Sequence, residues 1–116
     1  MKPDHVVQRK SYDFALSIIR LYMELQGQRE YFLSRQLLRC GTSIGANVEE
    51  ALAAQSRADF ASKMSIASKE ARESNYWLRL LRDSELTSVD VSFQLSQSSE
   101  LVKLLASIVK STKDNS

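Results

Sequence analysis

The sequence predicts an all-α protein, an antiparallel up-down-up-down bundle of four helices. Its 116 residues include only three Gly and one Pro, so the chain is poor in residues that interrupt helices and form β-turns. Apolar residues recur three and four positions apart in four segments, a spacing that places them on one face of a helix. Short connections between these segments favour antiparallel neighbours. We expect one domain over residues 1–116, because a chain of this length can bury a core.

The first two helices are predicted over about residues 11–26 and 34–54. Gly27 marks the expected C-terminal end of the first helix. Ser34 is expected to cap the free N–H groups at the start of the second. The apolar faces of the two helices consist of Phe14, Ile18, Leu21 and Leu25, and of Leu37, Gly41, Ile44, Val48 and Leu52.

The last two helices are predicted over about residues 57–82 and 88–110. Ser56 and Asp59 have the spacing of a capping box, and the acid also suits the positive end of the helix dipole. The segment 87–90 is similarly cap-like. In both helices the apolar positions alternate in steps of four and three, the pattern of helix packing in bundles. In the third helix they are Phe60, Met64, Ala67, Ala71, Ser74, Leu78 and Leu81.

A second, polar stripe lies about 120° round the second helix from its apolar face, by the roughly 100° turn per residue of an α-helix. It consists of Gln36, Arg39, Ser43, Asn47 and Glu50. We interpret this stripe as a hydrogen-bonding seam against another helix. On the third helix, Glu70 and Glu73 share one face and are expected to accept hydrogen bonds from the Arg39 guanidinium. The alternative to a structural seam, which specifies the bundle or its assembly, is a ligand site.

Two small-residue features of the second helix have structural interpretations. Gly41 and Gly45 bracket a segment that has no Lys, unlike a phosphate-binding loop, so we expect them to allow close helix approach. Cys40 is the single cysteine and lies beside the apolar face, so it is expected to be a buried core residue.

The sequence contains no constellation typical of catalysis or metal binding. Its only histidine is His5, which we expect in an N-terminal segment ahead of the first helix. Glu70 and Glu73 without a nearby histidine are a poor transition-metal site, although di-metal centres occur in four-helix bundles. No Ser-His-Asp set or phosphate-cradling glycine loop is present. We therefore expect no catalytic residue, metal or cofactor, and a protein that is not an enzyme.

A third face of the third helix is basic with one interposed aromatic residue: Lys69, Arg72, Tyr76 and Arg79. This combination is typical of nucleic-acid contacts, because the cations meet phosphates and the ring stacks on a base. The alternative is an ordinary exposed helix surface. The net charge of only +2 means that the overall field of one subunit attracts nucleic acid weakly.

No stretch approaches the ~20 apolar residues that span a bilayer, and a single cysteine suits a reducing compartment. We therefore expect a cytoplasmic protein with no membrane contact. Helices two and three each have more than one face unsuited to solvent, which exceeds what a lone bundle needs and predicts self-association.

The second and third predicted helices also carry a specific set of spaced residues. They are Gln36–Arg39, Ser43–Ile44, Asn47–Val48 and Glu50, then Phe60, Ile66–Ala67, Lys69–Glu73 and Tyr76–Leu78. Over about residues 9–110, this set resembles the four-helix bundle protein family, also known as the 23S rRNA intervening-sequence proteins. Ala51 departs from the family pattern, where many members have Gly after the Glu.

The resemblance implies a cytosolic bacterial protein that forms a ring of five subunits. Related proteins include the accessory variability determinant of diversity-generating retroelements, a basic pentameric barrel that partners a reverse transcriptase and binds nucleic acid. The leading prediction is a noncatalytic homo-oligomer whose ring presents a basic face to RNA, single-stranded DNA or a protein that handles them. The alternative is a protein-protein scaffold or adaptor with no nucleic-acid contact.

Overall fold

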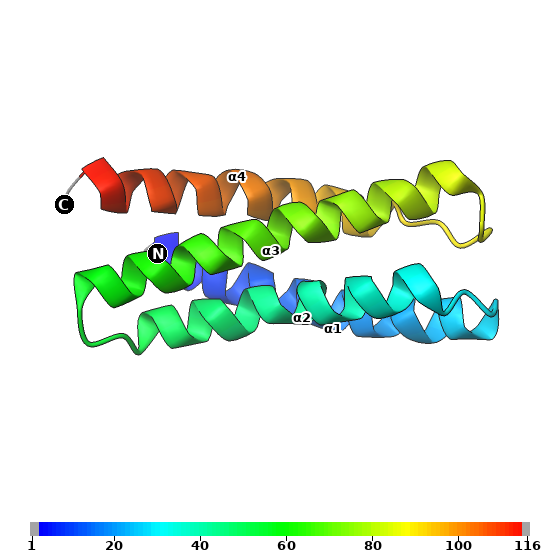
Figure 1. The fold of residues 1–116 in the computed structure, drawn as a ribbon, viewed down its shortest axis with the longest axis horizontal. Coiled ribbons are helices and arrows are strands. Elements are labelled where there is room, and N and C mark those ends of the chain that lie inside the picture. The colour runs from blue at the N-terminus through cyan, green and yellow to red at the C-terminus, as the bar shows by residue number, and fades with distance from the viewer. Residues whose placement is uncertain (1–2, 115–116) are drawn as a thin grey trace.

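The structure is a computed structural model that describes residues 3–114, with side chains from His5 onward. It consists of four helices: α1 (Pro3–Gly27), α2 (Phe32–Leu52), α3 (Arg57–Ser84) and α4 (Ser92–Asp114). Between residues 3 and 114 there is no β-strand, so the predicted all-α fold with four helices is confirmed. Successive helices run in opposite directions along a body of 46 × 24 × 21 Å (Figure 1).

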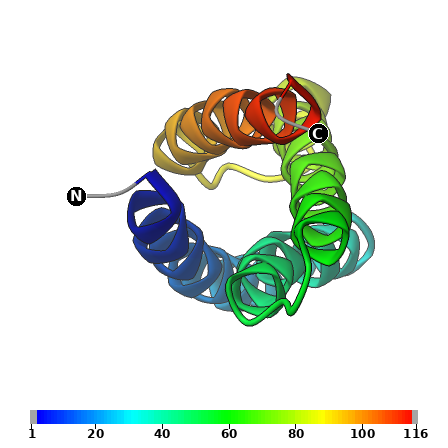
Figure 2. The ribbon, with the colours of Figure 1, turned by 90° about the vertical axis from the view of Figure 1, so that its left-hand side faces the viewer.

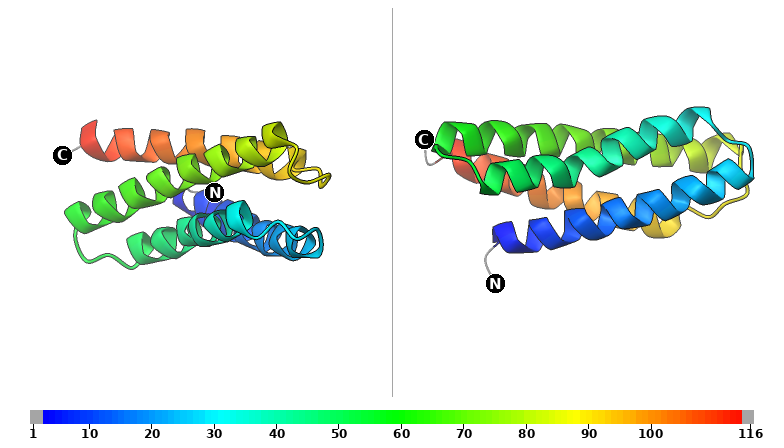
Figure 3. Two further views of the ribbon diagram at one scale, coloured as in Figure 1. Left: turned by 45° about the vertical axis from the view of Figure 1, so that its right-hand side comes forward. Right: turned by 90° about the horizontal axis from the view of Figure 1, so that it is seen from below.

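Each helix packs against two neighbours, so the four form a closed square seen end-on (Figure 2). α2 contacts α1 and α3, and α4 contacts α3 and α1, which is also visible from below (Figure 3). The core lies along the axis between them because each helix turns one apolar stripe inward. Its largest fully buried side chains include Phe14, Ile18, Leu21, Leu25, Leu37, Ile44, Met64, Leu78, Leu81, Leu101 and Leu105.

α1 begins at Pro3, well before the predicted start near Ser11. Proline suits the first turn of a helix, where its missing N–H has no acceptor to lose. Val7 and Ser11 are both buried and continue the inner stripe toward the N-terminus. His5 consequently lies within α1, where it is exposed, and not in a separate segment ahead of the helix.

α1 ends in a Schellman motif in which Arg29, not Gly27, takes the left-handed conformation. Arg29 has φ 62°, its N–H donates to the carbonyl of Gln26, and the N–H of Glu30 donates to the carbonyl of Leu25 at 2.9 Å. Gly27 has no positive φ. The prediction that the first helix ends at Gly27 is therefore confirmed, although Arg29 is the residue in the left-handed conformation.

The start of α2 is capped by the buried carboxylate of Glu30, which the sequence analysis did not identify. Its two oxygens accept hydrogen bonds from the backbone N–H groups of Leu33 at 2.9 Å and Ser34 at 2.7 Å. Ser34, predicted to be the cap, instead donates its hydroxyl to the Glu30 carbonyl at 2.7 Å. A carboxylate here also meets the positive end of the helix dipole. α2 therefore begins at Phe32 and ends at Leu52, two residues ahead of the predicted bounds.

α3 has the N-terminus that the sequence predicts. The Ser56 hydroxyl accepts a hydrogen bond from the backbone N–H of Asp59 at 3.0 Å, which confirms the capping interaction. The helix ends at Ser84, where Glu85 follows with a φ of 59°. The predicted end near residue 82 is thus two residues short.

α4 begins at Ser92, later than the predicted residue 88, because the preceding segment is held by Gln28 in the connection between α1 and α2. The Gln28 side chain accepts a hydrogen bond from the Ser88 N–H at 3.0 Å and donates to the Ser88 hydroxyl at 2.9 Å. Val91 is buried, and the Asp90 carboxylate accepts a hydrogen bond from the Ser92 N–H at 2.9 Å. This hydrogen bond lowers the pKa of Asp90. α4 then continues to Asp114, beyond the predicted residue 110.

Candidate nucleic-acid interface and polar seam

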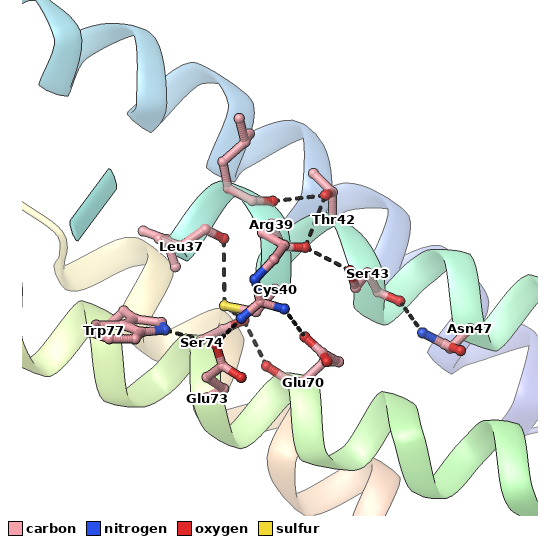
Figure 4. Close-up of polar contacts among 11 residues, drawn as sticks. Leu37, Arg39, Cys40, Thr42, Ser43, Asn47, Glu70, Glu73, Ser74 and Trp77 are labelled. Atoms are coloured by element: carbon pink, nitrogen blue, oxygen red, sulfur yellow. Dashed lines mark hydrogen bonds and ion pairs between the residues drawn. The ribbon is translucent and has the colours of Figure 1, made fainter. Parts of the chain in front are cut away.

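The α2–α3 junction contains the charged cluster that the sequence analysis proposed (Figure 4). The Arg39 guanidinium on α2 donates a hydrogen bond to the Glu73 carboxylate on α3 and lies 3.5 Å from a Glu70 oxygen. The indole N–H of Trp77 donates to the same Glu73 oxygen at 3.0 Å. Glu70, Glu73 and Trp77 are spaced three and four residues apart, so they share the face of α3 that meets α2.

Burial differs sharply within this cluster. The side chain of Arg39 is 53% exposed, whereas those of Glu73 and Glu70 are 35% and 19% exposed. The Glu70 oxygen nearest Arg39 is itself buried and accepts no hydrogen bond from any described residue. The ion pair between Arg39 and Glu73 contributes little to stability, because solvent screens the attraction between exposed charges. Arg39 is nevertheless the counter-charge for a buried carboxylate oxygen that has no donor.

The remaining members of the predicted seam do not bond across the junction. The Ser43 hydroxyl donates to the Arg39 carbonyl at 2.7 Å, and the Asn47 amide donates to the Ser43 carbonyl at 2.9 Å. Gln36 and Glu50 make no side-chain hydrogen bond to any residue that the structure describes. Within one subunit, as far as the structure describes it, Arg39 is therefore the only member of the stripe whose side chain bonds across to α3, and a role of the stripe in assembly stays a prediction. Short polar side chains can instead donate a hydrogen bond to the backbone carbonyl one turn back along their own helix.

Cys40 lies behind this cluster, in the core. Its Sγ is 3.2 Å from the hydroxyl of Ser74 on α3, a buried polar residue that the sequence analysis counted as part of the apolar stripe. Burial raises the pKa of the Cys40 thiol to about 11. The thiol is therefore protonated at neutral pH, and a protonated thiol is a poor nucleophile. This placement confirms the expectation of a buried core cysteine.

The two glycines of α2, which were predicted to allow close helix approach, both face α1. A Cβ on Gly41 would lie 3.0 Å from two carbons of the Ile18 side chain, closer than ordinary van der Waals contact. A Cβ on Gly45 would lie 3.4 Å from the Ser11 carbonyl oxygen. Gly41 thus allows the close approach of α1 and α2, whereas a methyl group on Gly45 would meet its neighbours at ordinary van der Waals contact distance.

The four predicted nucleic-acid contacts all lie on the outward side of α3. Lys69, Arg72, Tyr76 and Arg79 are exposed. Arg79 is held in place, because its Nε donates to the Asn75 side chain at 3.0 Å and its guanidinium lies 5.7 Å from the centre of the Tyr76 ring. Tyr76 also meets the Trp77 ring edge-on, at 5.3 Å between centroids. The aromatic face is thus oriented at the surface and remains 47% exposed.

This basic face continues into a groove between α3 and α4. Arg72 lines the groove together with Lys110 and Lys113 from α4, and its volume is about 370 Å³. Asp114 is the only acid in the lining. The sequence analysis missed the two lysines, because only the packing of α4 on α3 brings them beside Arg72. Their spacing of three residues on one helix face was the available signal.

Metal-binding clusters and membrane-spanning helices are both absent from the part of the chain that the structure describes. No group of three or more His, Cys, Asp or Glu side chains there is arranged to hold a metal ion. No helix within residues 3–114 combines the length and apolar character needed to cross a bilayer.

The fold and these surfaces define a small helical-bundle protein whose polar groups gather at one helix junction and on one exposed basic face. The model of the 23S rRNA-intervening sequence protein family matches residues 3–107. Since the match covers nearly all of the chain, the protein belongs to the 23S rRNA-intervening sequence protein family. The resemblance seen in the sequence is confirmed.

A solved structure agrees with this assignment. The chain is 50% identical to a protein of unknown function from the S23 ribosomal protein family of Bacteroides thetaiotaomicron, whose crystal structure superposes with a TM-score of 0.87. The similarity covers 94% of this chain and 99% of the other. A comparison with curated proteins found no match.

Proposed function

We propose that this protein is a noncatalytic homo-oligomer that binds RNA or single-stranded DNA through the outward face of α3. The observation that carries the proposal is the exposed set of Lys69, Arg72, Tyr76 and Arg79, which continues into the Lys110 and Lys113 side of the α3–α4 groove. Cations at this face would neutralise phosphates and release their counterions. The oriented Tyr76 ring would provide a stacking surface for a base.

Self-association would raise the affinity of this basic face for nucleic acid. One subunit carries a net charge of +2, so the five subunits that the family resemblance implies would carry about +10. Once one copy of the site has bound a flexible strand, the other copies in the assembly meet that strand at a high effective concentration. The assembly therefore binds more tightly than one copy alone.

The test is fluorescence anisotropy of a labelled single-stranded RNA pool at low salt, with Arg72→Ala/Lys110→Ala compared with wild type. These two residues line the same groove from different helices, so their joint loss should weaken binding at least tenfold. Arg35→Ala, which removes one exposed cation from α2, is the control and should leave affinity within twofold. Equal losses in both variants would show that any cation suffices and would contradict a site on α3.

The second candidate function is a protein-protein scaffold with no nucleic-acid contact. One observation favours it: α1 exposes large apolar side chains to solvent, including Tyr12 and Met23. Contiguous exposed apolar side chains are typical of protein interfaces. An anisotropy that stays flat with RNA and single-stranded DNA at low salt would support the scaffold and exclude nucleic-acid binding.

A further inference from the structure

The outward face of α1 carries an apolar stripe with coiled-coil spacing. Tyr12, Leu16, Ile19 and Met23 follow one another in steps of four, three and four, and they are 61%, 36%, 45% and 65% exposed. By the roughly 100° turn per residue, this stripe lies opposite the buried Phe14–Ile18–Leu21 stripe. α1 therefore has two apolar faces, and within one chain only the inner face is covered.

A line of alternating charges runs along one flank of the apolar stripe. It consists of Arg9, Asp13, Arg20 and Glu24, in the order positive, negative, positive, negative. All four side chains are exposed, and none makes an ion pair or hydrogen bond with another residue in the described range. Flanking charges of this kind set partner choice and orientation in paired helices.

We propose that α1 pairs antiparallel with α1 of a second copy of this chain through this apolar stripe. In that arrangement Leu16 faces Ile19 of the second copy, and Tyr12 faces Met23. Each layer joins two large apolar groups, and the outer layers bring a thioether against an aromatic ring, which is a favourable contact.

The charge order selects this orientation and this partner. In an antiparallel pair related by a two-fold axis, each line of side chains along one helix lies beside the same line of the other helix in reverse order, so Asp13 lies beside Arg20 of the second copy and Arg9 beside Glu24. The two-fold axis repeats both contacts, which gives four pairs of opposite charge. A parallel pairing would instead place this flank beside the opposite flank of the second helix, where Ala15 and Tyr22 carry no charge, so the flanking charges would have no partner. The flank is thus complementary to a second copy of itself, which is the property that a two-fold interface requires.

The opposite flank is compatible with the same register. Ala15 on one helix opposes Tyr22 on the other, so a small side chain leaves space for a large one on both sides of the axis. α3, which carries the basic face, does not pack against α1 and lies diagonally across the bundle from it (Figure 2), so a contact through α1 would leave the basic face uncovered.

This inference rests on the self-association part of the proposed function and makes it more specific. A two-fold contact produces assemblies with an even number of subunits, so a five-membered ring would use a different surface. The pairing would then join two rings.

The test is sedimentation velocity over a concentration series, combined with a charge swap. Wild type should form an even-numbered species, the simplest with twice the 13.2 kDa subunit mass. Asp13→Arg and Arg20→Asp should each halve that mass or raise the dissociation constant at least tenfold, because like charges then face each other. The double variant Asp13→Arg/Arg20→Asp should restore the wild-type mass. Lys103→Glu, at an exposed position on α4, is the control and should have no effect.

Orientation is tested separately by cysteine crosslinking, since Cys40 is buried. An oxidised mixture of Tyr12→Cys and Met23→Cys proteins should yield the mixed disulfide, while either variant alone should not. Homodisulfides of each single variant would indicate a parallel pair and overturn the proposal.

Two further outcomes separate this inference from the proposed function. A five-subunit mass that the charge substitutions leave unchanged would overturn the α1 pairing and leave the oligomeric function intact. A monomer at every concentration would overturn both the pairing and the self-association, and the RNA titration would then decide nucleic-acid binding by itself.

Discussion

The α2–α3 junction and the outward face of α1 reverse the usual relation between residue type and environment. The junction lies between packed helices, yet it holds Arg39, Glu70 and Glu73, with a buried carboxylate oxygen that accepts no hydrogen bond from a described residue. The outward face of α1 meets solvent, yet it carries Tyr12 and Met23. Charged groups thus lie at one contact inside the subunit, whereas large apolar groups lie on a face that the subunit itself leaves open.

The largest expected effect comes from comparing two adjacent isoleucines, one on the buried face of α1 and one on its outward face. Ile18 is fully buried, so Ile18→Ala should lower the free energy of unfolding by about 2 to 5 kcal/mol. Ile19 is 45% exposed, so Ile19→Ala should change subunit stability by no more than about 0.5 kcal/mol while weakening self-association. Urea denaturation at low protein concentration measures the first quantity, and sedimentation measures the second. Equal stability losses would mean that the outward stripe is part of the fold of one subunit.

The next effect concerns the charged junction. Arg39→Ala should lower the free energy of unfolding by about 1 to 2 kcal/mol, because a buried Glu70 oxygen then lacks its counter-charge. This predicted loss is smaller than the loss expected for breaking a fully buried ion pair, because Arg39 is half exposed. Adding Glu70→Gln to the variant should recover most of the loss. Arg35→Ala on the same helix is the control, with a change within about 0.5 kcal/mol, and an equal loss there would contradict the account.

The smallest expected effect concerns the two glycines at the contact between α1 and α2. Gly41→Ala should lower the free energy of unfolding by about 1 kcal/mol, because overpacking against Ile18 exceeds the gain in helix propensity. Gly45→Ala should raise it by about 0.5 to 1 kcal/mol, because its neighbours lie at ordinary contact distance. Thermal melts of the two variants, with opposite shifts in Tm, would distinguish the two glycines. Stabilisation by both would show that Ile18 can move aside.

Periodicity was sufficient to predict four helices, because the inward stripes of a bundle obey one simple spacing. It failed where a tertiary contact decides the local structure. Gln28 holds the segment before α4, which delays the start of that helix to Ser92. A capping residue was also misassigned, because Glu30 is an uncommon cap and Ser34 is a common one.

The candidate site shows the same limit. One helix face can be read from spacing, so Lys69, Arg72, Tyr76 and Arg79 were predicted together. Lys110 could not be predicted as part of the site, because the sequence pattern does not show which turn of α4 packs beside Arg72. The hydrogen bonds of the polar stripe of α2 could not be predicted for a related reason. Spacing cannot tell whether a serine or asparagine bonds across to a neighbour or back to its own helix.

The salt dependence of RNA binding tests the central claim most directly. We would titrate labelled single-stranded RNA with wild-type protein over several salt concentrations and compare the slope of log affinity against log salt with that of Arg72→Ala/Lys110→Ala. The account predicts a negative slope that becomes shallower by about 1.4 when two phosphate contacts are lost, at about 0.7 per contact for single strands. Affinity that is absent at low salt, or that has the same slope in both proteins, would contradict nucleic-acid binding by this face.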